Sequence, residues 1–268
     1  MVTESIKAYH ASSPVSRSQL MKIAESPEKF QYYMENKEDP TEALLLGSAV
    51  HKLVLEPEDF DKEFAVEPVV NKRTNAGRDA LDAFYCANEG KIIITPKTYE
   101  QAKAMASSVL ANKQAKILLC GEVEKSYYWK DDITEEDVKC RPDCVTKLAG
   151  KTLIVDLKTG TNVTTENFSK EMIKYGYDVQ AAMCKDGVER EVGEECDVIY
   201  VAVEKEPPYA VNIMKTDALV IEYGKRRYRE FLGIYHECKT ANNWYGYLGF
   251  ANEVNVLSLP AYLLKELQ

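Results

Sequence analysis

Asp156 and Lys158 place a carboxylate and an ammonium group two residues apart inside an otherwise apolar segment, residues 152–158. Residues at that spacing on a β-strand point to the same face of the sheet. An unpaired buried charge costs several kcal/mol, so each group needs a partner. One interpretation is a structural ion pair, or a strand whose end reaches solvent. The other is a pair that acts on a ligand.

A second carboxylate precedes this strand. Asp143 ends an Arg-Pro-Asp tripeptide, and a turn near residues 149–150 would pair the two segments antiparallel and bring Asp143 beside Asp156. Proline suits a strand interrupted by a bulge, where its missing N–H is tolerated. Two carboxylates at one sheet end suit a divalent cation that holds a phosphate, while Lys158 orients an attacking water or steadies the charged oxygens. This is the chemistry of phosphodiester hydrolysis.

His51 and Gln180 are two further polar candidates. His51 follows a stretch of small residues on a predicted helix, where Gly47, one turn earlier, would let a backbone or a ligand approach closely. A lone histidine on an apolar helix is otherwise a core residue, and His10 and His236 are expected at the surface. Gln180 lies in the helix predicted after the Asp-x-Lys strand, within reach of a metal-bound water or the phosphate; alone it would be an ordinary solvated position.

The elements that position these residues begin with a helical N-terminal third. Helices are predicted over residues 43–55, 80–89 and 98–119, and residues 68–77 are expected to form an ordered loop with basic residues. The helix-start signals are the capping box Ser16-Arg17-Ser18-Gln19, the pair Ser26-Pro27, and Thr41.

Beyond residue 120 the hydrophobic pattern changes to that of strands. Segments 122–129, 138–146 and 152–158 predict an antiparallel meander, because short links join them. A helix over 164–185, strands over 196–203 and 209–214, and a closing helix over 217–240 follow. The predicted order is helices, three strands, a helix, two strands and a helix.

Composition limits the functional classes. The chain has 268 residues, of which 45% are hydrophobic and 29% charged, so disordered and collagenous classes are excluded. No apolar run is long enough to cross a bilayer, and the N-terminus lacks the apolar region of a signal peptide, so we expect a cytoplasmic protein without membrane partners. Seven scattered cysteines without a Cys-x-x-Cys pair predict reduced thiols rather than a metal site.

The net charge of −9 argues against nucleic-acid binding through bulk positive charge, so any such contact must be local. The densest basic clusters are residues 225–227 on the closing helix and a loop cluster formed by Lys72, Arg73 and Arg78. We expect the loop cluster to lie near a DNA path. The alternative for each cluster is a solvated charged surface.

Five separated motifs resemble the RecB-type branch of the PD-(D/E)XK nucleases, in the order of that branch. Segments 46–60, 71–77, 140–143 and 257–260 are most similar to the exonuclease VIII (RecE) family, and the resemblance runs from residue 9 to about residue 264. The motifs are Ser-x-Ser-x-Leu with Ser-Pro-x-x-Phe, Gly-Ser-Ala-Val-His-Lys, Arg-Pro-Asp, Val-Asp-Leu-Lys-Thr and Asp-Val-Gln.

This resemblance implies an α/β (α+β) fold with a restriction-endonuclease-like core, in which helices flank a mixed central sheet. It implies one domain over residues 1–268, with a helical portion over 1–120, a catalytic core over 121–240 and a tail over 241–268. The implied activity is a Mg²⁺-dependent exonuclease that degrades one strand of linear duplex DNA from the 5′ end. The remaining 3′ single strand would serve recombination by a partner annealing protein of the RecT type, in a phage or prophage setting.

The resemblance also assigns roles. His51, Asp143 and Asp156 would be metal ligands, Lys158 the catalytic lysine and Gln180 the helix glutamine. Mn²⁺ would substitute for Mg²⁺ because of the histidine ligand. Relatives form rings whose channel takes the duplex, so a homo-oligomeric ring is expected.

Some points stay open. Glu124 matches the acidic residue of the first meander strand, which the resemblance makes a further metal residue, and Glu122, two residues earlier on the same face, is its rival. Cys184 stands where the family commonly has a tyrosine, for which Tyr175 or Tyr177 would have to compensate. The alternative functions are a single-strand or structure-specific nuclease of the RecB or Cas4 type, and a silent DNA-binding subunit of the same fold. Cas4-like proteins use cysteine clusters that this chain lacks.

Overall fold

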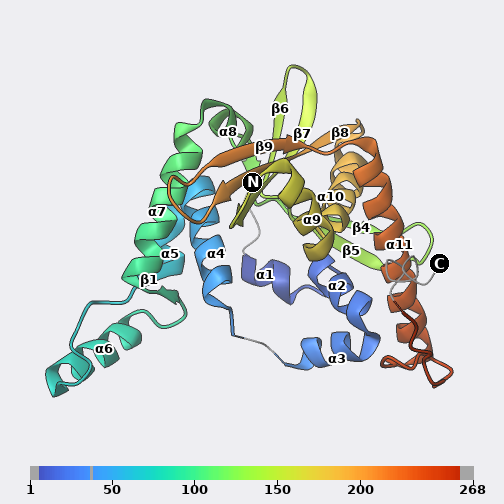
Figure 1. The fold of residues 1–268 in the computed structure, drawn as a ribbon, viewed down its shortest axis with the longest axis horizontal. Coiled ribbons are helices and arrows are strands. Elements are labelled where there is room, and N and C mark those ends of the chain that lie inside the picture. Colours follow the sequence, from blue (N-terminus) through green and yellow to red (C-terminus); the bar gives the residue numbers. More distant parts are fainter. Residues whose placement is uncertain (1–5, 37–38, 260–268) are drawn as a thin grey trace.

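The apolar run that contains Asp156 forms the central strand of a mixed five-stranded sheet (Figure 1). A computed structural model describes residues 6–36 and 39–259. The predicted tail over 241–268 and the segment 257–260 are therefore described only to residue 259. The strands, in spatial order, are β3 (Glu122–Val123), β6 (Cys144–Leu148), β7 (Lys151–Gly160), β8 (Cys196–Glu204) and β9 (Val211–Lys215).

The hairpin between β6 and β7 fixes the register at the predicted site. Ala149 and Gly150 both have positive φ angles, +50° and +80°, which is the backbone of a tight hairpin turn. Cys144 therefore pairs with Val155, and Asp143 precedes that pair opposite Asp156. On its other edge β7 pairs in parallel with β8 along nine residues, from Thr152 to Gly160. Both edges of β7 are thus hydrogen-bonded.

The predicted meander is wrong in one respect, because two of its three segments each divide between two sheets. Segment 122–129 forms β3 and β4 (Tyr127–Lys130), and segment 138–146 forms β5 (Asp137–Cys140) and β6. β4 and β5 pair with each other as a separate ribbon, and Val15 adds a single parallel bridge to Val138 of β5. The breaks fall at Glu124, which has a φ of +51°, and at the Arg-Pro-Asp tripeptide, whose proline cannot donate to a ladder.

The N-terminal helices begin where the sequence predicts. α2 (Arg17–Glu25) has a capping box in which Gln19 Oε1 accepts a hydrogen bond from the Ser16 N–H at 2.7 Å. Ser26 caps α3 (Pro27–Glu35), and Thr41 caps α4 (Glu42–Leu55). These predictions are confirmed, and α4 is the helix that carries His51.

Two predicted helices are each divided. Residues 98–119 belong to α7 (Pro96–Ala111) and α8 (Lys113–Leu118), because the Asn112 side chain caps a new helix. Residues 164–185 belong to α9 (Thr165–Tyr175) and α10 (Tyr177–Val192), joined at Gly176, which has a φ of +67°. α6 (Asn75–Ala87) begins five residues earlier than predicted, so the basic loop ends at Thr74, and α11 (Ala218–Ala241) matches its prediction closely.

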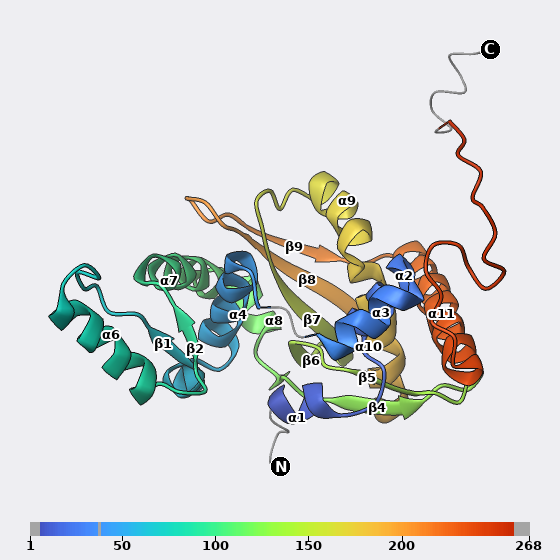
Figure 2. The same ribbon diagram turned by 90° about the horizontal axis from the view of Figure 1, so that it is seen from below.

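Several short elements have no counterpart in the sequence prediction. Two of them, β1 and β2 (residues 64–66 and 92–94), form a parallel two-stranded sheet beside α4 and α7, and α6 projects beyond these helices (Figures 1 and 2). These elements are α1 (Ile6–Ala11), η1 (Pro57–Asp59), α5 (Phe60–Glu63), β1 (Phe64–Val66) and β2 (Ile92–Ile94).

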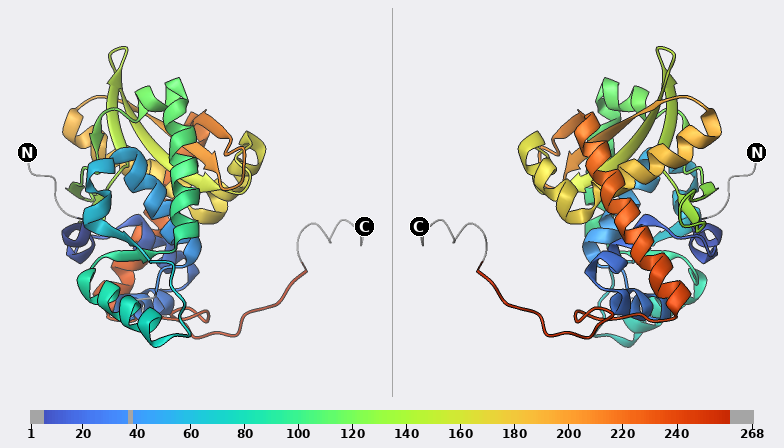
Figure 3. Two further views of the ribbon diagram at one scale, coloured as in Figure 1. Left: turned by 90° about the vertical axis from the view of Figure 1, so that its left-hand side faces the viewer. Right: turned by 90° about the vertical axis from the view of Figure 1, so that its right-hand side faces the viewer.

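Two hydrophobic cores lie on opposite faces of the main sheet. The first joins Leu20 of α2 to Tyr200 of β8 and Tyr228 of α11, and the second joins Val50 of α4 to Leu157 of β7. Figure 3 shows α7 over one face and α11 over the other. β7 supplies side chains to both cores, as a strand buried on two faces must. Within the described ranges, no helix is long and apolar enough to cross a membrane.

Candidate active site

Asp143, Asp156 and Lys158 meet where β7 passes the start of β6. Lys158 Nζ donates to both carboxylate oxygens of Asp156, each at 2.7 Å. Asp143 Oδ2 accepts a hydrogen bond from the Leu157 N–H at 2.6 Å. Asp156 is 3% exposed and Asp143 9%, so both carboxylates are buried. The structure therefore brings together the three residues that the strand pattern predicted.

His51 reaches this group from α4. Its Nε2 lies 2.7 Å from the Leu157 carbonyl oxygen and 3.0 Å from Asp143 Oδ2. Its Nδ1 lies 2.8 Å from the Gly47 carbonyl oxygen, one turn back along the helix. That carbonyl accepts from Nδ1, so the ring is oriented with Nε2 toward the carboxylates. A Cβ at Gly47 would lie 3.7 Å from the nearest side-chain atom, an ordinary contact, so the close protein approach expected there is absent.

Charge and burial set the protonation of these groups. Burial lowers the pKa of His51, but the carboxylate of Asp143 outweighs it and raises the pKa to about 9. Burial raises the pKa of Asp156, and although Lys158 opposes this, the neighbouring Asp143 adds to it, giving a pKa of about 7. The pKa of Lys158 is also raised, since Asp156 and Asp143 outweigh the effect of burial. The two buried carboxylates thus lie beside two cationic groups, His51 and Lys158, which balance their charge.

Glu124 and Glu122 lie in different surroundings. Glu124 lines the cleft above the carboxylates, and its Oε2 accepts a hydrogen bond from Arg141 Nε at 2.8 Å. Burial, together with the charge of Asp143, raises the pKa of Glu124. Glu122 is exposed and forms an ion pair with Lys125 at 2.9 Å. Of the two rivals, Glu124 is the one at the cleft.

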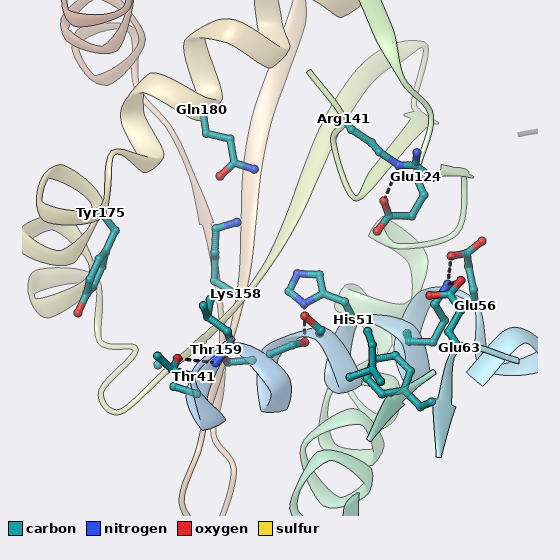
Figure 4. A pocket seen from close by; sticks show the side chains of 18 of the residues that line it. Thr41, His51, Glu56, Glu63, Glu124, Arg141, Lys158, Thr159, Tyr175 and Gln180 are labelled. Carbon is teal, nitrogen blue, oxygen red and sulfur yellow. Dashed lines mark hydrogen bonds and ion pairs between the residues drawn. The ribbon is translucent and has the colours of Figure 1, made fainter. Parts of the chain in front are cut away.

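The cleft has a volume of about 1090 Å³ and opens above Lys158 (Figure 4). Gln180 points into it from α10, toward Lys158, and Tyr175 lies on the α9 side. Glu124 and Arg141 form the opposite wall. Cys184, where the motif resemblance leads us to expect a tyrosine, is 3% exposed in the first core and does not line the cleft.

Two arginines that line the cleft, Arg17 and Arg141, were not among the site residues predicted from the sequence. Arg17 lies inside the capping box of α2, and its guanidinium donates to backbone carbonyls 158 and 159 residues away. Arg141 belongs to the Arg-Pro-Asp tripeptide. Its contact with Glu124 forms because the chain passes from the β4–β5 ribbon to β6 of the main sheet at this tripeptide. No local signal in the sequence marks either contact, because both are made between distant segments.

A sequence model described as "PDDEXK-like domain of unknown function (DUF3799)" matches residues 16–255. The chain belongs to this family. The predicted restriction-endonuclease-like fold is therefore confirmed. A comparison with curated proteins gave no match.

Solved structures support the same fold for this PDDEXK-like chain. It is similar to a candidate exonuclease from Eubacterium rectale, with a TM-score of 0.58, 13% identity, and coverage of 99% of this chain and 98% of the other. A phage-related exonuclease from Haemophilus somnus 129PT gives a TM-score of 0.32 at 13% identity, covering 73% of this chain and 95% of the other. The first likeness shows a shared fold, and the second is too low to carry an argument.

The donor atoms of this PDDEXK-like site fit a hard divalent cation. They comprise two carboxylates, the imidazole of His51 and the carbonyl of Leu157, a set that Mg²⁺ and Mn²⁺ accept. Within the described part of the chain, no three His, Cys, Asp or Glu side chains already form a metal cluster. Each carboxylate instead has a protein partner: Lys158 donates to Asp156, and the Nε2 proton of His51 is donated to Asp143. A cation therefore competes with these two partners.

The predicted basic clusters do not line the cleft. Lys72 and Arg73 lie in the loop before α6, and Lys72 is paired with Glu67 at 2.6 Å. Arg78 lies in the first turns of α6 and donates to Asn75 at 2.7 Å. Figures 1 and 2 place this helix at the far end of the molecule from α11.

In the cluster over residues 225–227, ion pairs hold two of the three side chains. Lys225 pairs with Asp186 at 3.1 Å and Arg227 with Asp178 at 2.8 Å. That part of α11 therefore serves packing against α10, which carries both aspartates.

Proposed function

We propose that this protein is a divalent-metal-dependent DNA nuclease. The observation that supports it most directly is the meeting of two carboxylates, Asp143 and Asp156, with Lys158 and His51. Lys158 and His51 line the cleft, and the carboxylates lie buried beside them. A buried ion pair alone would account for Asp156 and Lys158. It would not account for a second buried carboxylate, Asp143, that His51 and the Leu157 N–H hold beside them.

Each residue has a distinct part in the proposed hydrolysis. A bound Mg²⁺ supplies positive charge to the scissile phosphate and lowers the pKa of a water molecule. Asp143 and Asp156 hold that charge in place, and His51 adds a neutral donor when its Nε2 is unprotonated. Lys158 orients the attacking water and neutralises charge on the phosphate oxygens. Water oxygen bonds to phosphorus, the bond from phosphorus to one sugar oxygen breaks, and solvent takes up and returns the protons.

More specifically, we propose an exonuclease that degrades linear duplex DNA from 5′ ends and leaves a 3′ strand for an annealing protein. Support for this finer assignment comes from the motif resemblance to the RecE family. The name of the Eubacterium rectale protein, a candidate exonuclease, is in keeping with it. The same resemblance supports a homo-oligomeric ring that encloses the duplex.

The test uses linear duplex DNA labelled at either the 5′ or the 3′ end, with Mg²⁺, Mn²⁺ or EDTA. Early release of mononucleotides from the 5′ label, with the 3′-labelled strand left long, is the expected result. Closed circular duplex and labelled single strands serve as matched substrates. Cleavage of the circle would contradict the exonuclease assignment, and a preference for single strands would favour the RecB-like alternative.

Two variants separate nuclease chemistry from contamination. Lys158→Met removes the ammonium group at the cleft floor and is expected to abolish cleavage. Lys103→Met removes an exposed lysine on α7 that lies outside the cleft and contacts Glu100 and the Tyr99 ring, and is expected to cleave like the wild type. If neither the wild type nor the control variant cleaves any labelled DNA with either metal, the chain is a silent subunit and the proposed function is wrong.

A further inference from the structure

Lys158 has a second neighbour besides Asp156. The ring of Tyr177 lies with its centroid 5.0 Å from Lys158 Nζ, within the range of a cation–π contact. The ammonium group is therefore bounded on one side by a carboxylate and on another by an aromatic ring. A lysine side chain has four rotatable bonds, so a single salt bridge leaves its head group several arrangements. The ring removes some of them.

The Tyr177 ring is itself held in place. Phe168 of α9 lies 5.8 Å away, and Tyr200 of β8 lies 6.3 Å away, as ring-centroid distances. The Tyr200 hydroxyl donates to the Tyr177 carbonyl oxygen at 2.7 Å. The ring and the backbone of Tyr177 are thus both fixed to the strand that pairs with β7.

The turn that carries Tyr177 is held by the N-terminal helix α2. Arg17 donates to the carbonyl oxygens of Tyr175 and Gly176, the last at 3.3 Å. A Cβ at Gly176 would lie 2.4 Å from the sulfur of Met21, so α2 packs directly on this turn. Arg17 also lies 5.7 Å from the Tyr177 ring centroid. A helix distant in sequence therefore sets where the first residue of α10 lies.

We propose that Tyr177 is a positioning residue for Lys158, and that Arg17 acts through it by fixing the turn between α9 and α10. The inference rests on the proposed function, in which Lys158 acts at the phosphate. It assigns the ring, rather than the hydroxyl, to this role, because the ring faces the ammonium group. It also makes α2 part of the active site.

The kinetic test compares a ring-preserving and a ring-deleting substitution. Tyr177→Phe is expected to keep kcat within about twofold, whereas Tyr177→Leu loses about tenfold to a hundredfold, with KM for a short duplex unchanged, as for a misplaced catalytic group. Tyr223→Leu, the same change at an exposed tyrosine of α11 outside the cleft, is the matched control. Arg17→Gln keeps the ring but releases the turn, and is expected to fall between Tyr177→Phe and Tyr177→Leu.

A readout that does not depend on cleavage is the NMR signal of the lysine ε-CH₂ groups, assigned for Lys158 by its loss in Lys158→Arg. The Tyr177 ring should shift this signal to lower ppm than those of the other lysines. The shift should persist in Tyr177→Phe and disappear in Tyr177→Leu.

Three results would overturn the proposal. They are an unshifted Lys158 signal in the wild type, a Tyr177→Leu variant with wild-type kcat, and a Tyr177→Phe variant as impaired as Tyr177→Leu. If the wild type cleaves nothing, the proposed function fails, while the NMR result still decides whether the ring holds the ammonium group. If Tyr177→Leu does not fold, as its melting curve would reveal, Arg17→Gln carries both measurements.

Discussion

The two buried aspartates differ in what holds them. Asp143 accepts hydrogen bonds from a backbone N–H and from His51, whereas both oxygens of Asp156 face the Lys158 ammonium group. Two neighbouring buried carboxylates repel each other, so each lies beside a cationic side chain, His51 for Asp143 and Lys158 for Asp156. The contact between Asp156 and Lys158 could be predicted from the sequence, because residues two apart on a strand point to the same face. The contact of His51 with Asp143 joins residues 92 apart, and only the family resemblance indicated it.

Asp156→Ala is expected to abolish metal-dependent cleavage and to leave the fold intact. The carboxylate stabilises bound positive charge more than it stabilises the chain, since its burial raises its pKa. Initial rates of strand release and thermal melting curves measure the two effects. A purified variant with more than about a tenth of the wild-type rate would show that Asp156 is no metal ligand, because loss of a ligand costs more than this.

His51→Ala is expected to weaken Mn²⁺ binding more than tenfold and to change the melting temperature little. The reason is that Nε2 faces Asp143 and the Leu157 carbonyl oxygen rather than the apolar core. Calorimetric titration with Mn²⁺ and melting curves are compared with those of His10→Ala. A lower melting temperature with an unchanged titration would make His51 a core histidine.

At the scale of elements, the site depends on interruptions of a helix and of two strands that the hydrophobic pattern did not predict. Gly176 lies within a continuous helical periodicity, and a glycine inside a helix is tolerated, so residues 164–185 were predicted as one helix. The break instead follows from packing against Met21 of α2, a contact between distant segments. Similarly, Pro142 predicted an interruption, but the exchange of partners between β5 and β6 depends on which strands lie nearby.

Gly176→Ala tests the turn between α9 and α10. A side chain at a φ of +67° costs about 1–2 kcal/mol, and the contact with Met21 adds about 1–3 kcal/mol for overpacking. Gly193→Ala is the matched control, because Gly193 has a φ of +69° and nothing within 4 Å of an added Cβ. Urea unfolding should show a larger loss for Gly176→Ala. Equal losses would mean that α2 does not constrain the turn.

Glu136 joins the β4–β5 ribbon to α11 and makes stability depend on pH. Burial raises the pKa of this carboxylate, but hydrogen bonds from Lys239 Nζ and His236 Nδ1 outweigh it and lower the pKa. A lowered folded-state pKa means that the carboxylate stabilises the protein above its unfolded pKa near 4.5 and loses this effect as the pH falls through the folded value.

The Glu136→Gln variant should therefore be less stable than the wild type at pH 7, with the difference shrinking below pH 4.5. Urea unfolding at both ends of this range measures the difference. Glu253→Gln, an exposed glutamate of the C-terminal segment, is expected to show none. A difference for Glu136→Gln that stays constant with pH would contradict the assignment.

At the scale of the whole molecule, a chain of charge −9 must concentrate its attraction for phosphate. The loop cluster of Lys72, Arg73 and Arg78 lies on the projecting part of the molecule and not in the cleft. A ring of subunits would allow such projections to line a shared channel. This arrangement is a proposal that rests on the family resemblance, since neither the order of the elements nor the charge pattern predicts an assembly.

Replacing both Arg73 and Arg78 with alanine is expected to weaken duplex binding and to reduce the slope of its salt dependence, because fewer counterions are released. Metal binding should not change. Fluorescence anisotropy at several salt concentrations measures the slope, and sedimentation at micromolar concentration measures the assembly. A monomer that still degrades long duplexes processively would refute the ring.

The candidate active site depends on both hydrophobic cores. α4, which carries His51, packs in one core, and α2, which carries Arg17, packs in the other, while β7 is shared by both. If either core opened, β7 would keep its hydrogen bonds to β6 and β8, but the helix packed in that core would carry its side chain away from the strand. The aspartates would then lack either His51 on α4 or the contact of Arg17 on α2 with the turn before α10. The candidate site is therefore complete only when both cores are formed.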